Sequence, residues 1–150
     1  ARMNKSEIYA ACIIKQQTKL EELQNAIDKV QESIVGEDNS TAGNKFETAR
    51  AMGQEELDRL NQTINIALRE MTLLSNISPD KQCDSVQLGA LITTDKTMLY
   101  LCVGLGKIAI GNDTVFAIST GSPIGTQLMG KEKGADVVFG GKKEKIVSVA

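Results

Sequence analysis

Hydrophobic residues recur with a heptad spacing in the first half of the chain. Residues 5–35 contain neither Pro nor Gly, and their apolar positions follow one another at intervals of three and four residues: Leu20, Leu23, Ile27, Val30 and Ile34. The same spacing returns within residues 46–76, at Leu57, Leu60, Ile64, Ala67, Met71 and Leu74. Such spacing places apolar side chains on one face of a helix. The two matched faces predict two helices that pack along a common seam.

Residues 36–44 separate the two helical patterns and are almost entirely polar. They contain two glycines and several side chains that can cap a helix. We therefore expect a turn at the tip of an antiparallel hairpin, whose helices of about 30 residues would be roughly 45 Å long. The same pattern is typical of a dimerisation coiled coil or of half a four-helix bundle, so these alternatives stay open.

The pattern changes after Ser78-Pro79 to short β-prone runs at residues 88–93, 98–103, 107–110 and 115–119. These runs predict an antiparallel meander. Ser122 and Pro123 then predict the start of a short helix ending at Gly130, and residues 135–139 and 144–149 predict a closing hairpin. The expected fold class is α+β, with a helical hairpin over residues 1–78, its tip at about 36–44, and an antiparallel β domain over 79–150.

Charge and cysteine usage narrow the class of protein. Residues 1–78 carry 9 basic and 12 acidic side chains and residues 79–150 carry 8 and 7, which gives the net charge of -2. Neither part is a polycation, so independent nucleic-acid binding is disfavoured and a protein partner is expected. Three cysteines without a CxxC spacing predict reduced thiols. With no apolar run of about 20 residues and no secretory signal, we expect a cytoplasmic protein without a membrane partner.

The chain offers little chemistry of its own. It has no histidine, which removes the usual general base and the commonest nitrogen metal ligand, and it has no phosphate-binding glycine loop. We therefore expect no enzymatic activity and no cofactor of its own. Glu37 and Asp38 are adjacent acids in the expected tip. They can share an oxygen-liganded Mg²⁺ with groups from a partner, or they can form an ordinary solvated loop.

Residues 118–139 read ISTGSPIGTQLMGKEKGADVVF. This run resembles the C-terminal signature of the Gre family of transcription factors: Ile-Ser, then Ser-Pro-[Ile/Met]-[Ala/Gly], then Leu-x-Gly-Lys, then Gly-Asp-x-Val. Here Ala135 is an additional residue before Asp136. Residues 46–50, which begin with Phe46, resemble the segment that follows the tip in the same family. The resemblance implies an N-terminal coiled coil and an FKBP-like C-terminal domain.

The resemblance also implies a partner, the bacterial RNA polymerase core. The C-terminal domain would bind the rim of the polymerase secondary channel through Gly121, Ser122, Pro123 and Ile124. The hairpin would enter the channel, so that nucleic acid is met only within that complex. There the tip acids of the family help to hold Mg²⁺ and a water at the polymerase active site, and backtracked RNA is cleaved by the polymerase itself.

Alignment of the tip through Phe46 puts Asn39 and Ala42 where cleavage-competent relatives carry their two acids, with Asn44 beside them. Glu37 and Asp38 lie one or two positions away. They either replace the acid pair after a shift of the loop or belong to a factor that binds without stimulating cleavage. We expect a monomer, with a dimer as the alternative if the chain is a non-catalytic interaction module.

Short members of this family are sometimes labelled 3-oxoacyl-ACP synthases. A condensing enzyme needs a far larger thiolase-like fold and usually a histidine beside its nucleophilic cysteine. The chain has 150 residues and no histidine. We therefore expect no condensing activity.

Overall fold

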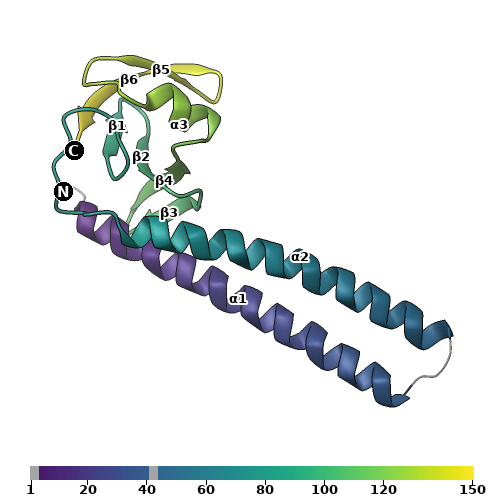
Figure 1. Cartoon of the computed structure of the whole chain (residues 1–150). Coiled ribbons are helices and arrows are strands. Elements are labelled where there is room, and N and C mark those ends of the chain that lie inside the picture. Colours follow the sequence, from purple (N-terminus) through teal and green to yellow (C-terminus); the bar gives the residue numbers. More distant parts are fainter. Residues whose placement is uncertain (1–3, 41–43) are drawn as a thin grey trace. The chain divides into compact units, whose positions relative to one another are not determined.

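The computed structural model describes the backbone of residues 4–40 and 44–150, and the side chains of residues 4–35 and 47–150. It divides into two compact units, residues 16–71 and residues 1–15 with 72–150. Helices α1 (Lys5–Ser40) and α2 (Asn44–Ser75) each contribute to both units (Figure 1). The expected domain boundary between residues 78 and 79 separates the helices from the strands and not these two compact units. It stays a prediction.

In the unit formed by residues 16–71, α1 and α2 pack as an antiparallel pair. Gln16 contacts Ala67, and Ile34 lies against Gly53, so the residue numbers run in opposite directions along the seam. The seam itself is the one predicted from the heptads, with these residues in contact: Leu23, Ala26, Ile27, Val30, Ile34, Leu57, Leu60 and Ile64. The helical hairpin is therefore confirmed.

The expected turn at residues 36–44 is too long. Helix α1 continues to Ser40 and α2 begins at Asn44, so residues 36–40 are helical rather than part of a loop. Polar residues cost an exposed helix under about 1 kcal/mol each, whereas each added residue completes one more backbone hydrogen bond. Helix propagation therefore prevails over the turn-forming composition, and residues 41–43 lie outside the described residues.

The other unit contains a six-stranded, mostly antiparallel sheet with one short helix, α3 (Pro123–Leu128). The strands are β1 (Leu91–Thr94), β2 (Met98–Cys102), β3 (Gly106–Ile110), β4 (Asp113–Ser119), β5 (Asp136–Phe139) and β6 (Lys142–Val149). They are arranged in the order β3-β4-β2-β1-β6-β5. This confirms the expected α+β class, and the closer FKBP-like assignment stays a prediction.

The antiparallel meander expected for the first four strands is wrong. Strand β2 pairs in parallel with β4, for example Leu99 with Phe116, and β3 occupies the edge of the sheet beyond β4. A central strand has to bury both of its faces, and β3 exposes Lys107 and Ala109. Strand β4 buries Val115 and Ala117 on one face and packs Phe116 and Ile118 against a cluster on the other, so it suits the position beside β2. This distinction was not visible from strand propensity alone.

The sheet is covered on both faces, which explains the uninterrupted apolar sequence of β2. Tyr100 and Cys102 face a cluster that includes Ile8 and Cys12 from the first turns of α1. The intervening Leu99 and Leu101 belong to the opposite cluster, which includes Leu128 of α3. A strand buried on both faces loses the alternation of polar and apolar residues.

Among the described residues, no helix combines the length and the apolar character that crossing a membrane requires.

Candidate functional site

The segment that we call the docking segment, residues 121–124, joins β4 to α3. Ser122 has an extended backbone (φ -70°, ψ 160°) and is the N-cap of α3. Its Oγ accepts a hydrogen bond from the Gly125 N–H at 3.0 Å and donates one to the Ser119 carbonyl oxygen at 2.7 Å. The Ser122 carbonyl oxygen accepts from the Thr126 N–H at 2.8 Å. The serine side chain is thus fully engaged inside the turn.

Pro123 follows at the first position of the helix, where a missing N–H costs nothing, and its side chain is exposed. Ile124 is half-buried and packs against the cluster around Leu128. Gly121 is exposed, and a Cβ atom there would meet no atom within 4 Å. The docking segment therefore presents Pro123 and part of Ile124 outward, while Ser122 holds the turn.

Two residues outside the sequence-based site keep this geometry in place. A Cβ atom at Gly125 would lie 2.0 Å from the Ser119 carbonyl oxygen, so only glycine fits there. The side-chain amide of Gln127 accepts a hydrogen bond from the Val138 N–H at 2.5 Å and donates one to the Val138 carbonyl oxygen at 3.1 Å. This pair of bonds ties α3 to the outer edge of β5. For Gly125, the only signal in the sequence was a glycine within a predicted helix. For Gln127, no local signal in the sequence indicated its role.

The structure does not test the predicted tip residues. Glu37, Asp38 and Asn39 have helical backbone at the end of α1, and Asn44 and Phe46 have helical backbone at the start of α2. Their side chains, and all of Ala42, lie outside the described residues. The role of Glu37 and Asp38 beside Mg²⁺ therefore stays a prediction.

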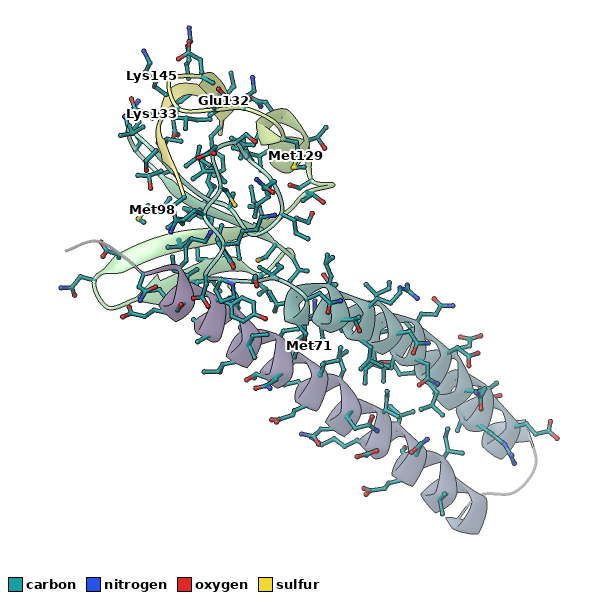
Figure 2. The ribbon with its side chains drawn as sticks, turned by 60° about the vertical axis from the view of Figure 1, so that its left-hand side comes forward. Met71, Met98, Met129, Glu132, Lys133 and Lys145 are labelled. Carbon is teal, nitrogen blue, oxygen red and sulfur yellow. The ribbon has the colours of Figure 1, made fainter. Side chains whose placement is uncertain are left out.

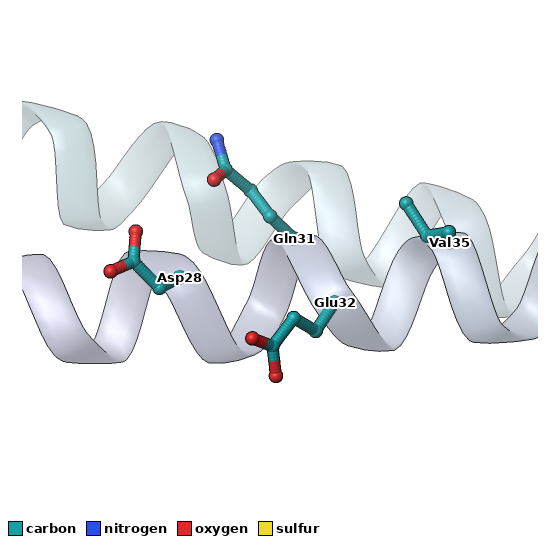
Figure 3. Close-up of a pocket in the computed structure, with 4 residues that line it drawn as sticks. All are labelled: Asp28, Gln31, Glu32 and Val35. Carbon is teal, nitrogen blue, oxygen red and sulfur yellow. The ribbon is translucent and has the colours of Figure 1, made fainter.

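An open groove of about 580 Å³ lies on α1, lined by Asp28, Gln31, Glu32 and Val35 (Figure 3). Asp28 and Glu32 are one helical turn apart and exposed, and Asp28 already accepts a hydrogen bond from Gln24 at 3.0 Å. Two exposed carboxylates are too few for a metal ion. No group of three or more His, Cys, Asp or Glu side chains suited to a metal occurs among the described residues.

Three cysteines are free and buried in the sheet-containing unit. The Cys102 thiol donates a hydrogen bond to the Val103 carbonyl oxygen at 3.5 Å. Its interaction with the Cys12 thiol raises the pKa of Cys102 and lowers that of Cys12.

Burial lowers the pKa of Lys5, whose Nζ donates to the carbonyl oxygens of Lys81 at 2.7 Å and Ala150 at 3.1 Å. These groups hold the first turns of α1 against the sheet-containing unit. Lys5 also lines an open pocket of about 370 Å³ together with Asp80, Leu91 and Ala150.

The chain matches no protein-family model, and no curated protein matches it. Among solved structures it is similar to the transcription factor Gfh1, with a TM-score of 0.36 and 14% identity over 91% of this chain and 92% of that one. It is also similar to the GreA factor homolog 1 (Gfh1) protein of Thermus thermophilus, with a TM-score of 0.36 and 16% identity over 96% and 93% of the two chains. Both TM-scores lie below 0.5, so these likenesses assign no function to the chain.

Proposed function

We propose that this chain is a Gre-like transcription factor that binds the bacterial RNA polymerase core at the rim of its secondary channel and modulates elongation. One observation carries the proposal. The residues that resemble the family signature, 118–139, fold as a continuous unit of strand, capped turn, helix and strand, which leaves Pro123 exposed. Pro123 begins α3, and its exposed side chain is at the same time accessible to a partner.

The contacts within the docking segment give each residue a separate role. Pro123 and Ile124 contact the polymerase, because they are the apolar side chains that the turn leaves accessible. Ser122 and Gly125 are positioning residues, since the hydroxyl of one and the missing side chain of the other form the cap. Gly121 leaves space in front of the turn for the partner surface.

The length of the helical hairpin is the second feature on which the proposal depends. Residues 16–40 of α1 are continuous helix, and at about 1.5 Å per residue this portion is roughly 38 Å long. We propose that its end approaches the polymerase active site, where Glu37 and Asp38 contribute carboxylate oxygens to Mg²⁺ held by the polymerase. The water that attacks the RNA and the metal both belong to the polymerase complex. The chain is then an assisting factor and not itself an enzyme.

Binding is tested by pull-down of the cognate core polymerase with the full chain. Pro123→Ala should weaken association on the order of tenfold, as expected when a central apolar contact is truncated. Asn112→Ala, in the exposed turn between β3 and β4, is the matched control and should have no effect. Absence of association for the unmodified chain, under conditions where a Gre factor associates, would refute the proposal.

Cleavage is tested separately on stalled transcription complexes. The unmodified chain should accelerate transcript cleavage, and the double variant Glu37→Ala/Asp38→Ala should lose this effect while keeping its association with the polymerase. If the unmodified chain binds without accelerating cleavage, the assignment of the two acids is wrong and the factor acts by occupying the channel.

A second candidate function is self-association through the hairpin. Met52 and Ile66 lie two heptads apart on α2 and are 66% and 52% exposed, which leaves apolar side chains on a helix face away from the seam. Light scattering distinguishes the two functions. A stable dimer that dissociates in Met52→Glu/Ile66→Glu, together with no association with polymerase, would favour the interaction module.

A further inference from the structure

Basic residues are concentrated at one end of the sheet-containing unit. Residues 79–150 contain eight lysines and no arginine, and five of the lysines fall between positions 131 and 145. Figure 2 shows Lys133 and Lys145 projecting from the β5–β6 end of the domain. The chain as a whole is acidic, with a net charge of -2. Residues 131–145 also contain three acidic residues, so five positive and three negative charges leave this stretch with a net charge of +2.

The alternation of β6 aligns part of this cluster on one face. Glu144 and Ile146 are buried, whereas Lys143, Lys145 and Val147 are exposed. On the paired strand, Val137 is buried, and Val138 stands opposite Lys143 with 51% of its surface exposed. We call the exposed set the outer hairpin face: Asp136, Val138, Lys143, Lys145 and Val147. Its two valines lie beside its two lysines, which gives it both apolar and basic character.

The charge of this face is only partly compensated. Asp136 forms an ion pair with Lys143 at 3.4 Å, between side chains that are both more than half exposed. Among the described residues, Lys145 has no ion-pair partner. Lys142, at the hairpin turn, is also exposed. At the border of the face, Oδ1 of the exposed Asp95 accepts a hydrogen bond from the Lys145 N–H at 3.1 Å. The face, its turn and this border therefore carry three lysines against two aspartates, beside exposed aliphatic surface.

The free edge of β5 is blocked at Val138 against an additional strand. An extended peptide that joins a sheet needs the outward N–H and C=O groups of the edge strand. At Val138 both groups already bond to the side-chain amide of Gln127, at 2.5 Å and 3.1 Å. A partner segment is therefore directed onto the face of the hairpin, where a helix is the element that usually packs on a sheet.

The spacing of the lysines suits an acidic helix. Side chains two residues apart on one strand are separated by roughly 7 Å, and side chains three or four residues apart on a helix lie about 5–6 Å apart. Carboxylates one turn apart can thus face Lys143 and Lys145, and apolar residues of the same helix can cover Val138 and Val147. Nucleic acid fits less well, since the face has no arginine or aromatic side chain and includes Asp136.

We propose that the outer hairpin face binds an acidic amphipathic helix of a partner protein. The face includes no residue of the docking segment, and the proposal does not depend on polymerase binding.

The test uses the full chain and designed peptides, followed by the amide signals of Val138, Lys143, Lys145 and Val147 in nuclear magnetic resonance spectra. The probe is an 18-residue helical peptide of Leu, Ala and Glu with glutamates one turn apart. The same peptide with lysine in place of glutamate, and an acidic version interrupted by proline, are the controls. The acidic helix should shift these four signals, and both controls should leave them unchanged.

Charge reversal locates the interaction. Lys143→Glu/Lys145→Glu should weaken binding of the acidic helix on the order of tenfold. Lys29→Glu/Lys81→Glu changes the net charge equally at exposed positions that are not part of the face, and it should not weaken binding. Lys143→Gln/Lys145→Gln removes the two charges without reversing them and should weaken binding of the acidic helix less. This variant distinguishes a charge effect from a folding defect. Pull-down of polymerase with the Lys143→Glu/Lys145→Glu variant tests polymerase binding separately, so that a failure of this proposal can be distinguished from a failure of the proposed function.

Several results would overturn the proposal. These are no shift with the acidic helix, equal binding of the proline-interrupted peptide, or shifts centred away from the outer hairpin face. Tighter binding of a single-stranded oligonucleotide or of phosphatidylglycerol vesicles at the same face would assign it to a different class of partner.

Discussion

Gly125 lies so close to Ser119 that a Cβ atom on the glycine would be 2.0 Å from the serine carbonyl oxygen. The same oxygen accepts the hydrogen bond of the Ser122 hydroxyl at 2.7 Å. The approach of the two backbones thus allows one carbonyl group to hold the cap of α3 in place. A Cβ atom cannot be accommodated without separating β4 from the helix that follows it.

We therefore expect Gly125→Ala to destabilise the chain. Alanine gains about 1 kcal/mol over glycine within a helix, but a clash with backbone costs more, because it forces the turn apart. The expected net loss is about 1–3 kcal/mol of the free energy of unfolding, measured by urea denaturation. Gly121→Ala is the control and should change stability little, since no atom lies within 4 Å of its Cβ position. Equal effects of the two substitutions would contradict this account.

Gly53 and Ile34 provide a second close approach, in the hairpin. A Cβ atom at Gly53 would lie 2.7 Å from Cγ1 of Ile34, which is a partly exposed side chain and can move. We expect Gly53→Ala to be nearly neutral alone, because the helix-propensity gain of about 1 kcal/mol offsets the displacement of Ile34. In an Ile34→Ala background the full gain should appear. A double-mutant cycle in urea measures this difference, and an unchanged effect in the two backgrounds would refute it.

The hairpin could be predicted because its seam repeats over many residues, so that single exceptions such as Gly53 do not obscure the period. The strand order could not be predicted. Strand propensity identifies β3 and β4 equally well, and only the packing of both faces of β4, Val115 on one and Phe116 on the other, distinguishes the strand beside β2. The local pattern thus predicted most elements, while the pairing depended on contacts distant in sequence.

The candidate site divides in a similar way. The Ser-Pro start of α3 is a local signal, so Ser122 and Pro123 could be identified as the beginning of a helix from their order alone, whereas their role in binding stays a prediction from the resemblance. The hydrogen bonds between Gln127 and Val138 join residues 11 positions apart, and no sequence motif predicts them. At the tip, the polar composition predicted a loop, but α1 extends through Glu37 and Asp38. The backbone hydrogen bonds gained by extending the helix outweigh the preference of these residues for a turn.

Gln16 is fully buried in the hairpin unit. Its Nε2 donates to the Ala67 carbonyl oxygen at 2.9 Å, and its Oε1 has no hydrogen-bond partner among the described residues. We expect Gln16→Leu to raise the free energy of unfolding by about 1 kcal/mol, since it removes an unsatisfied buried oxygen. Gln17→Leu, at the exposed neighbouring position, should change it by less than about 0.5 kcal/mol. Urea denaturation of both variants checks this expectation, and a destabilised Gln16→Leu would show that the amide is satisfied.

Tyr100 and Tyr9 belong to the same part of the core but differ in their hydroxyl groups. The Tyr9 hydroxyl donates to the Leu74 carbonyl oxygen at 2.9 Å, whereas the Tyr100 hydroxyl has no partner among the described residues. We expect Tyr100→Phe to stabilise the chain at neutral pH by about 1 kcal/mol, and Tyr9→Phe to destabilise it by a similar amount. The two variants differ from the parent by one oxygen atom each, so opposite signs in urea denaturation can be assigned to hydrogen bonding alone.

The Tyr100 variant should also change the response to alkaline pH. Burial, and secondarily the nearby Cys102, raise the pKa of Tyr100 above its ordinary value of about 10. The unfolded chain therefore loses the phenolic proton first, so the stability that is present below about pH 10 is lost as the pH rises further. In Tyr100→Phe the alkaline unfolding midpoint should move upward. It should not disappear, because the pKa of Cys102 is also raised and acts in the same direction. An unchanged midpoint would mean that the Tyr100 hydroxyl is accessible to water in the folded chain.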